Sequence, residues 1–280
     1  MVYSILYTDR TTQFVQVFSN YDPSGFDPYQ NTVDPAVKGA SITLSSSGGS
    51  VVFRDTTLPR SDTSRYTDQI NAYYENSLTI DRSKSYTLVV QSPTVGSVRA
   101  TCVVPNFAYV SLVDGLQFFN GSAGTDKQVI RIQITTQGGA KGVWLRLFIE
   151  YEVLQDTVWI PKRMEVPLSY IKGVTPSLDA AFYPSLQRID GPIFIQAWSG
   201  AAFNAVRDYL FNSYPSSQLR LRRARFISTL VDDNIYNYYK VVNGFEDQLS
   251  IRTDRPDYTN IVGGAGIFGV CAVDTLSYGL

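Results

Sequence analysis

The sequence of 280 residues contains no histidine and only two cysteines, Cys102 and Cys271. Histidine is the usual general base near neutral pH and the commonest transition-metal ligand in proteins. Its absence excludes Ser-His-Asp and Cys-His catalysis and the zinc deaminases, and two cysteines alone do not complete a metal site. We therefore expect a protein that is not an enzyme and that carries no cofactor.

The two cysteines leave two interpretations open. In an oxidising compartment a bridge between Cys102 and Cys271 would close a very long loop, worth about 4–5 kcal/mol in the chain-entropy model. Free cysteine, however, is among the most buried residue types. We expect two buried free thiols, and the disulfide remains the alternative.

The chain also lacks a strong net charge and long apolar runs. Its formal net charge is −1, which predicts no steering toward nucleic acid or anionic lipid. No apolar run reaches the ~18 residues typical of a membrane-spanning helix. No signal peptide follows Met1, so we expect either a cytosolic protein or a chain trimmed to its mature region. Residues 2–7 already have the pattern of a strand, which favours trimming.

What the sequence does have is alternation of apolar and polar residues. With 44% hydrophobic residues it can bury a sizeable core. Alternation with one polar face is typical of half-buried antiparallel strands, and clusters such as residues 45–50 and 137–140 are typical of the turns between them. We expect an all-β protein, an antiparallel β-sandwich. The inward positions are Ala40, Ile42 and Leu44, then Tyr86, Leu88 and Val90, then Ile130, Ile132 and Ile134, then Leu145, Leu147, Ile149 and Tyr151.

A domain boundary is expected near Pro105. About seven short strands precede it, which suits an immunoglobulin-like or transthyretin-like sandwich over residues 1–105. A second β domain would occupy residues 106–280 and carry two short helices. The first helix would run from Ala201 to Asn212 after a cap at Ser199-Gly200, with Ala202, Val206, Tyr209 and Leu210 on one face.

The second helix would begin at Asp233, a good N-cap residue, and end at Asn243. Its buried face would hold Ile235, Tyr239 and Val242. Gly244 stands where a glycine commonly ends a helix.

Candidate ligand-binding residues fall into a basic and an aromatic group. Arg220, Arg222, Arg223 and Arg225 form the densest basic run; they could bind phosphate, an acidic glycan or an acidic partner, or form a solvated strand face paired with Asp232, Asp233 or Glu246. In a regular strand, Arg220 and Arg222 would share one face and Arg223 and Arg225 the other. Flat aromatic rings beside polar groups suit a sugar, although sandwich cores also use Trp and Tyr. The candidate set is Trp159, Trp198, Tyr236, Tyr238, Arg222 and Arg225, with Tyr209 and Tyr214 as further aromatic candidates.

Acidic residues offer two weaker sites. Asp22, Asp27 and Asp34 in a loop-like segment could gather around calcium, but their spacing does not match an EF-hand, and Asp is common in turns. Glu150 and Glu152 share one face of a strand. They would suit a glycosidase only if a second carboxylate stood opposite at about 5–9 Å.

The ending of the chain holds a run of glycines. Gly264, Gly266 and Gly269 form a G-x-G-x-x-G, but a dinucleotide site needs a following helix and an acidic residue about 20 positions on. The residues up to Leu280 leave no room for such a unit. We expect a structural segment, in which the glycines allow tight turns and Ile267 and Phe268 plug the second sandwich.

Residues 260–269 read Asn-Ile-Val-Gly-Gly-Ala-Gly-Ile-Phe-Gly and follow a Tyr-rich segment, residues 236–239. This ending resembles the C-terminus of a large family of Bacteroidetes cell-envelope lipoproteins of unknown function. Residues 14–17, 37–40, 86–90 and 100–105 also look like theirs. The resemblance implies export, a lipobox cysteine that anchors the protein to the outer membrane on its periplasmic or outer surface, and a gene often beside a TonB-dependent transporter.

These observations lead to one hypothesis and one alternative. We expect a non-enzymatic, envelope-exposed β-sandwich protein that binds a partner protein or ligand for an outer-membrane uptake system. The partner would be a TonB-dependent transporter, a glycan or a peptide, with membrane contact only through a lipid anchor. The alternative is a carbohydrate-active module, either a glycan-binding domain or a carboxylate-dependent hydrolase.

Overall fold

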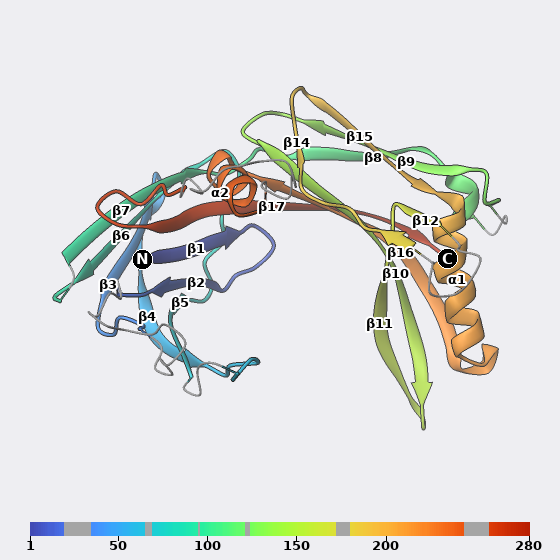
Figure 1. Ribbon diagram of the computed structural model, residues 1–280, viewed down its shortest axis with the longest axis horizontal. Helices are drawn as coiled ribbons and strands as arrows, with labels where there is room; N and C mark the ends of the chain where they lie inside the picture. The colour runs from blue at the N-terminus through green and yellow to red at the C-terminus, as the bar shows by residue number, and fades with distance from the viewer. Residues whose placement is uncertain (20–34, 65–68, 95, 121–123, 172–179, 244–257) are drawn as a thin grey trace, which may run out of the picture. The chain divides into compact units, whose positions relative to one another are not determined.

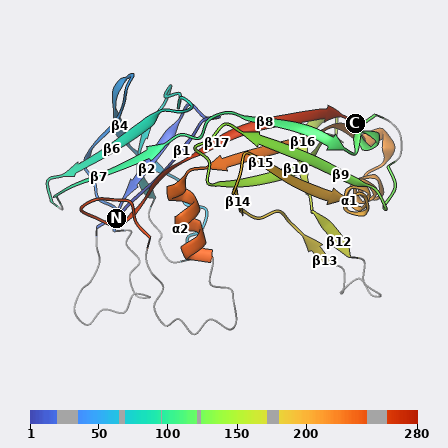
Figure 2. The same ribbon diagram turned by 90° about the horizontal axis from the view of Figure 1, so that it is seen from above.

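The computed structural model describes residues 1–19, 35–64, 69–94, 96–120, 124–171, 180–243 and 258–280 (Figures 1 and 2). Strands dominate these residues, and the α-helices among them number two, α1 and α2. The expected all-β sandwich class with two helices is confirmed. Neither helix is long and apolar enough to span a membrane.

The chain forms two compact units. Unit 1 contains residues 1–106, 139–141 and 231–272, and unit 2 contains residues 107–138, 142–230 and 273–280. Unit 1 thus includes the segment that carries α2 and the first half of β17, which returns to it after most of unit 2.

The described residues of unit 1 form eight strands in the order β17-β1-β2-β5-β4-β3-β6-β7. The strand β4 pairs with β3 through its first half and with β5 through its second half, so one strand serves two sheets. Strand β1 runs parallel to β17, whereas its pairing with β2 is antiparallel. The bounds are β1 Val2–Tyr7, β2 Gln13–Val17, β3 Ser41–Ser46, β4 Gly49–Leu58, β5 Ile70–Glu75, β6 Ser85–Ser92, β7 Gly96–Val103 and β17 Gly266–Gly279.

Unit 2 contains two larger sets of strands. One is a three-stranded sheet in the order β15-β9-β8, and the other follows the order β11-β10-β16-β17. The bounds are β8 Ala108–Asp114, β9 Val129–Thr136, β10 Gly142–Gln155, β11 Val158–Val166, β12 Ser169–Ile171, β13 Ala180–Phe182, β14 Gln187–Arg188, β15 Ile193–Ser199 and β16 Leu219–Val231, with 3₁₀ helices η2 Leu116–Phe118 and η4 Ser216–Gln218.

The side chains that form the cores of the two units alternate along the strands as the sequence predicts. All the expected inward positions on β3, β6, β9 and β10 are buried. In unit 2 an aromatic cluster completes the core: the rings of Trp198 and Phe226 lie 5.6 Å apart, and those of Phe118 and Phe203 lie 5.4 Å apart. Edge-to-face pairs of this kind add to the stabilisation from burial alone.

Helix α1, Gly200–Ser213, begins as expected, because the backbone N–H of Ala202 donates to the hydroxyl of Ser199 at 3.1 Å. Its buried face contains Phe203, Val206 and Leu210. The expectation that Tyr209 lies on this face is wrong, since Tyr209 is exposed. A residue immediately before Leu210 is turned away from it by about 100° in a helix of 3.6 residues per turn.

Helix α2, Asp233–Asn243, has a different cap from the expected one. The carboxylate of Asp232 accepts the backbone N–H of Ile235 at 2.9 Å, so Asp232 takes the capping role and Asp233 lies in the first turn. Ile235 is buried as expected, but Tyr239 is exposed. Gly244 and the side chain of Val242 lie outside the described residues.

The glycine-rich ending packs in unit 1, which corrects the expectation that it plugs a second sandwich. The side-chain amide of Asn260 pairs with the backbone of Phe268 in the way that a neighbouring strand would. It accepts the N–H of Phe268 at 2.9 Å and donates to the carbonyl of Phe268 at 2.6 Å. Phe268 itself is fully buried. At Gly266 the φ angle is +119°, and a Cβ atom would stand 1.9 Å from the carbonyl oxygen of Val2. The glycine therefore lets β17 approach β1.

Both cysteines are buried free thiols in unit 1. Burial raises the pKa of Cys271 to about 12 and the pKa of Cys102 well above its ordinary value. Thiols of this kind react poorly because the thiolate is the nucleophile.

Candidate binding face

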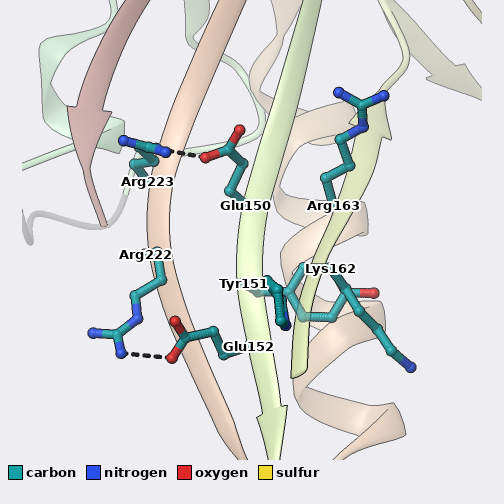
Figure 3. Close-up of a pocket in the computed structure, with 8 residues that line it drawn as sticks. Glu150, Tyr151, Glu152, Lys162, Arg163, Arg222 and Arg223 are labelled. Carbon is teal, nitrogen blue, oxygen red and sulfur yellow. Dashed lines mark hydrogen bonds and ion pairs between the residues drawn. The ribbon is translucent and has the colours of Figure 1, made fainter. Parts of the chain in front are cut away.

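The outward side of strands β11, β10 and β16 in unit 2 collects most of the charged candidates. Glu150 on β10 pairs across the strands with Arg163 on β11, and Glu152 pairs with Pro161, so these residues share one side of the hairpin. An open depression of about 640 Å³ lies here (Figure 3). Its lining residues are Glu150, Tyr151, Glu152, Pro161, Lys162, Arg163, Arg222 and Arg223. We call this side of the three strands the charged face.

Arginines from β16 hold the two glutamates of β10. Arg222 pairs with Glu152 at 2.5 Å, while Glu150 accepts from both Arg223 and Arg225, the latter at 3.2 Å. Figure 3 shows Arg222 and Arg223 reaching toward the two carboxylates from the neighbouring strand. The solvated-face interpretation predicts pairing with Asp232 or Asp233, but the observed partners of these three arginines are the glutamates of β10. Glu246, the third partner that it predicts, lies outside the described residues.

The strand β16 is irregular where the arginines cluster. Its burial alternates up to Arg222, but Arg222 and Arg223 are both exposed before alternation resumes with Ala224 buried. Such a phase shift is typical of a β-bulge, in which one extra residue re-aims the side chains that follow. The division of Arg222 and Arg223 between two faces, expected for a regular strand, is therefore wrong. Both serve the charged face.

Aromatic rings support the guanidinium groups on this face. Arg220 lies 3.8 Å from the centre of the Trp159 ring. Two guanidinium groups stack on the buried ring of Phe148. That of Arg146 lies 4.7 Å from the ring centre, and that of Arg163 lies 5.0 Å from it. Guanidinium groups stack well on rings and keep their N–H donors at the edge of the plane. The rings therefore restrict the orientations of the stacked guanidinium groups.

The charged face is locally basic in a protein that is nearly neutral overall. Its positive groups, Arg146, Arg163, Arg220, Arg222, Arg223 and Arg225, face the carboxylates Glu150, Glu152 and Glu165. Among the described residues, neither Arg163 nor Arg220 forms an ion pair with a carboxylate. Burial raises the pKa of Glu150, but hydrogen bonds and charges from Arg223 and Arg225 outweigh it and lower that pKa. Glu150 is thus held as a carboxylate.

The candidate ligand-binding residues do not form one site. Trp159, Arg222 and Arg225 come together on the charged face. Trp198 is fully buried in the core of unit 2. The remaining two, Tyr236 and Tyr238, lie on α2 in unit 1, and Tyr238 lines a separate depression of about 310 Å³ with Tyr3, Tyr7 and Arg10 among its neighbours.

Two residues of the charged face, Arg163 and Phe148, were not among the candidates. The guanidinium group of Arg163 stacks on the ring of Phe148, which completes the arrangement. A sequence signal existed for both, since a tight hairpin around residues 156–157 puts residue 163 opposite residue 150 and residue 165 opposite residue 148. The shift of alternation in β16, which brings Arg223 onto the same face as Arg222, left no such signal.

The acidic residues proposed for calcium, Asp22, Asp27 and Asp34, lie outside the described residues. Within the described part of the chain no cluster of His, Cys, Asp or Glu could hold a metal ion. On the charged face the positions opposite Glu150 and Glu152 are taken by arginines and Pro161. A second carboxylate is missing from those positions.

No protein-family model matches the chain, and a search of curated proteins gives no match. Among solved structures, one similar chain is the C-terminal globular domain of an oligosaccharyltransferase from Pyrococcus abyssi. It is 9% identical, and the match covers 82% of this chain and 43% of that chain with a TM-score of 0.24. The chain therefore spans less than half of that domain, and a likeness at this level carries no argument about function.

Proposed function

We propose that this protein is a non-enzymatic binding protein of the bacterial cell envelope, and that its charged face contacts a partner protein of an outer-membrane uptake system. The observation that carries the proposal is the arrangement of five arginines around two recessed glutamates; the arginines are Arg163, Arg220, Arg222, Arg223 and Arg225. Arginine and aromatic residues are enriched where proteins bind one another. The resemblance of residues 260–269 to envelope lipoproteins supports the location.

The ordering of this face also supports a binding role. An ordinary solvated strand surface gains little from exposed ion pairs, and long side chains there keep their rotamer freedom. Here Arg220 stacks on Trp159, and Glu150 is shared by two arginines. A surface with its side chains already in place loses less entropy when a partner binds.

The alternative is a carbohydrate-active module. A hydrolase of that kind needs one carboxyl group that holds a proton as general acid, whereas Glu150 has a lowered pKa. A pyranose would stack on an open ring face, and a guanidinium covers the face of Trp159 at 3.8 Å. The charged face thus suits a protein partner better than a neutral sugar.

Photo-cross-linking in cells tests the proposal. A photoreactive amino acid replaces Arg163, which is exposed on the charged face, or Gln133, which faces away from the core of the other sheet of unit 2. We expect one dominant adduct with an outer-membrane protein from position 163 and none from position 133. Equal adducts from both positions, or adducts only with soluble proteins, would contradict the proposal.

A glycan array distinguishes the alternative. The purified protein is applied to neutral and acidic polysaccharides, with a variant carrying Trp159→Ala as the comparison. Retention of a neutral glycan that is lost in this variant would replace the proposed partner with a sugar. We expect no such retention.

A further inference from the structure

The two glutamates of the charged face are the internal partners of three of its arginines. We propose that the charged face binds an extended acidic segment of a partner protein, whose carboxylates take the place of Glu150 and Glu152 on the arginines. This inference rests on the proposed function and names the chemistry of the partner. Glu150 and Glu152 would then act as internal competitors for the arginines.

The exposure of the paired side chains supports this arrangement. The Glu150 and Glu152 side chains are 18% and 24% exposed, whereas those of Arg222 and Arg223 are each 51% exposed. The carboxylates are recessed and the guanidinium groups form the outer layer. A guanidinium has five N–H donors in a fixed fork, so one carboxylate leaves donors for a second acceptor.

The spacing of the internal pairs indicates the shape of the ligand. Glu150 and Glu152 stand two residues apart on an extended strand, about 7 Å along the chain, and three arginines of β16 match them. The face therefore already fits carboxylates displayed at alternate positions of an extended chain. A peptide with acidic residues at every second position repeats that spacing.

The charged face has more arginines than carboxylates, so it attracts an acidic ligand. The pairs to Glu150 and Glu152 use Arg222, Arg223 and Arg225, and Arg163 and Arg220 remain at the two sides, held on Phe148 and Trp159. An incoming carboxylate meets donors that are already oriented, which suits bidentate recognition. A neutral or basic segment would gain none of these contacts.

The test uses a fluorescent peptide of about eight residues with alternating Glu and Thr, followed by anisotropy. Its isomer with all Glu residues in one block has the same charge, and polygalacturonate serves as an acidic glycan. We expect the alternating peptide to bind at least about threefold more tightly than the block isomer, and both to weaken with salt. Arg222→Gln with Arg223→Gln should weaken binding about tenfold or more.

The deciding variant is Glu150→Gln. It frees Arg223 and Arg225 from their internal partner, so we expect the peptide to bind about three- to tenfold more tightly. A matched control is Asp114→Asn, which removes the partner of Arg131 on the other sheet of unit 2 and should leave binding unchanged. Circular dichroism confirms that both variants melt as folded proteins.

Unchanged or weaker binding in a folded Glu150→Gln variant would overturn the internal-competitor inference. Equal affinity for the two isomers would overturn the extended geometry. Binding of polygalacturonate without binding of the peptide would replace the acidic segment with an acidic glycan. The cross-linking result at position 163 is independent of these outcomes, so failure of this inference is distinguishable from failure of the proposed function.

Discussion

The glycine-rich ending in unit 1 and the arginine run in unit 2 are the two most conspicuous clusters of the sequence, and they differ in their surroundings. Gly266 and Phe268 are enclosed by backbone and apolar side chains. Arg222 and Arg223 are half exposed and meet carboxylates at the surface. A conspicuous motif with buried neighbours is a packing device, whereas one whose donors stay exposed is available to a partner.

The largest effect is expected from Gly266→Val. A side chain at this position meets the carbonyl oxygen of Val2 and must adopt a φ angle of +119°. We expect a loss of more than about 4 kcal/mol in the free energy of unfolding, measured with urea. Gly49→Val is the control, because Gly49 has φ +129° with no atom within 4 Å of its Cβ position. It should lose only about 1–2 kcal/mol through backbone strain, and equal losses would show that the contact with β1 is unimportant.

Phe268→Ala should rank next. The ring is fully buried in unit 1, and its removal leaves a cavity that costs about 3–5 kcal/mol. Phe211→Ala provides the comparison, since Phe211 is exposed on α1, and should cost less than about 1 kcal/mol. If Phe268→Ala left the urea midpoint unchanged but abolished binding of a partner, the ending would be a site and the distinction between the two motifs would fail.

Asp232→Asn should change the pH dependence of unit 1. Burial raises the pKa of Asp232 from 3.8 to about 7. The pKa of Asp232 is higher in the folded than in the unfolded state. Its contribution to the free energy of unfolding is therefore fully present below about pH 4 and is lost as the pH rises through about 7. The loss is at most roughly 4 kcal/mol.

Asparagine still caps the helix and carries no charge. The variant should therefore be more stable than the natural chain at about pH 8 and lose less stability between about pH 4 and pH 8. Urea unfolding at several pH values measures this difference. If the free energy of unfolding changed equally with pH in the two proteins, Asp232 would stay ionised in the folded state.

The smallest effect on stability is expected on the charged face. Arg222→Gln removes an ion pair whose arginine is half exposed, and such pairs contribute about 1 kcal/mol or less. Thermal melts should therefore change little, and less still at high salt. A loss comparable to that of Phe268→Ala would make the arginines structural and weaken the contrast between the two motifs.

Much of the fold was predictable because burial in a strand follows a period of two. Ile130, Ile132 and Ile134 on β9, and Leu145 and Leu147 on β10, are buried as expected. The first helix was predictable from its cap at Ser199. The cap of the second was displaced by one residue, because Asp232 and Asp233 are chemically equivalent in the sequence and only packing decides which carboxyl points back at the helix.

The sequence by itself determined the all-β class, the inward positions of the strands and the exclusion of histidine chemistry, since each depends only on composition and local periodicity. Tertiary structure decided which distant segments meet. The parallel pairing of β17 with β1 joins the two ends of the chain, and the pairs between Glu150 and Arg223 or Arg225 join residues more than seventy positions apart. The shift of alternation at Arg222 and Arg223 also depends on tertiary structure, because the fit of β16 against its neighbours, and not the residues of β16 alone, sets where it occurs.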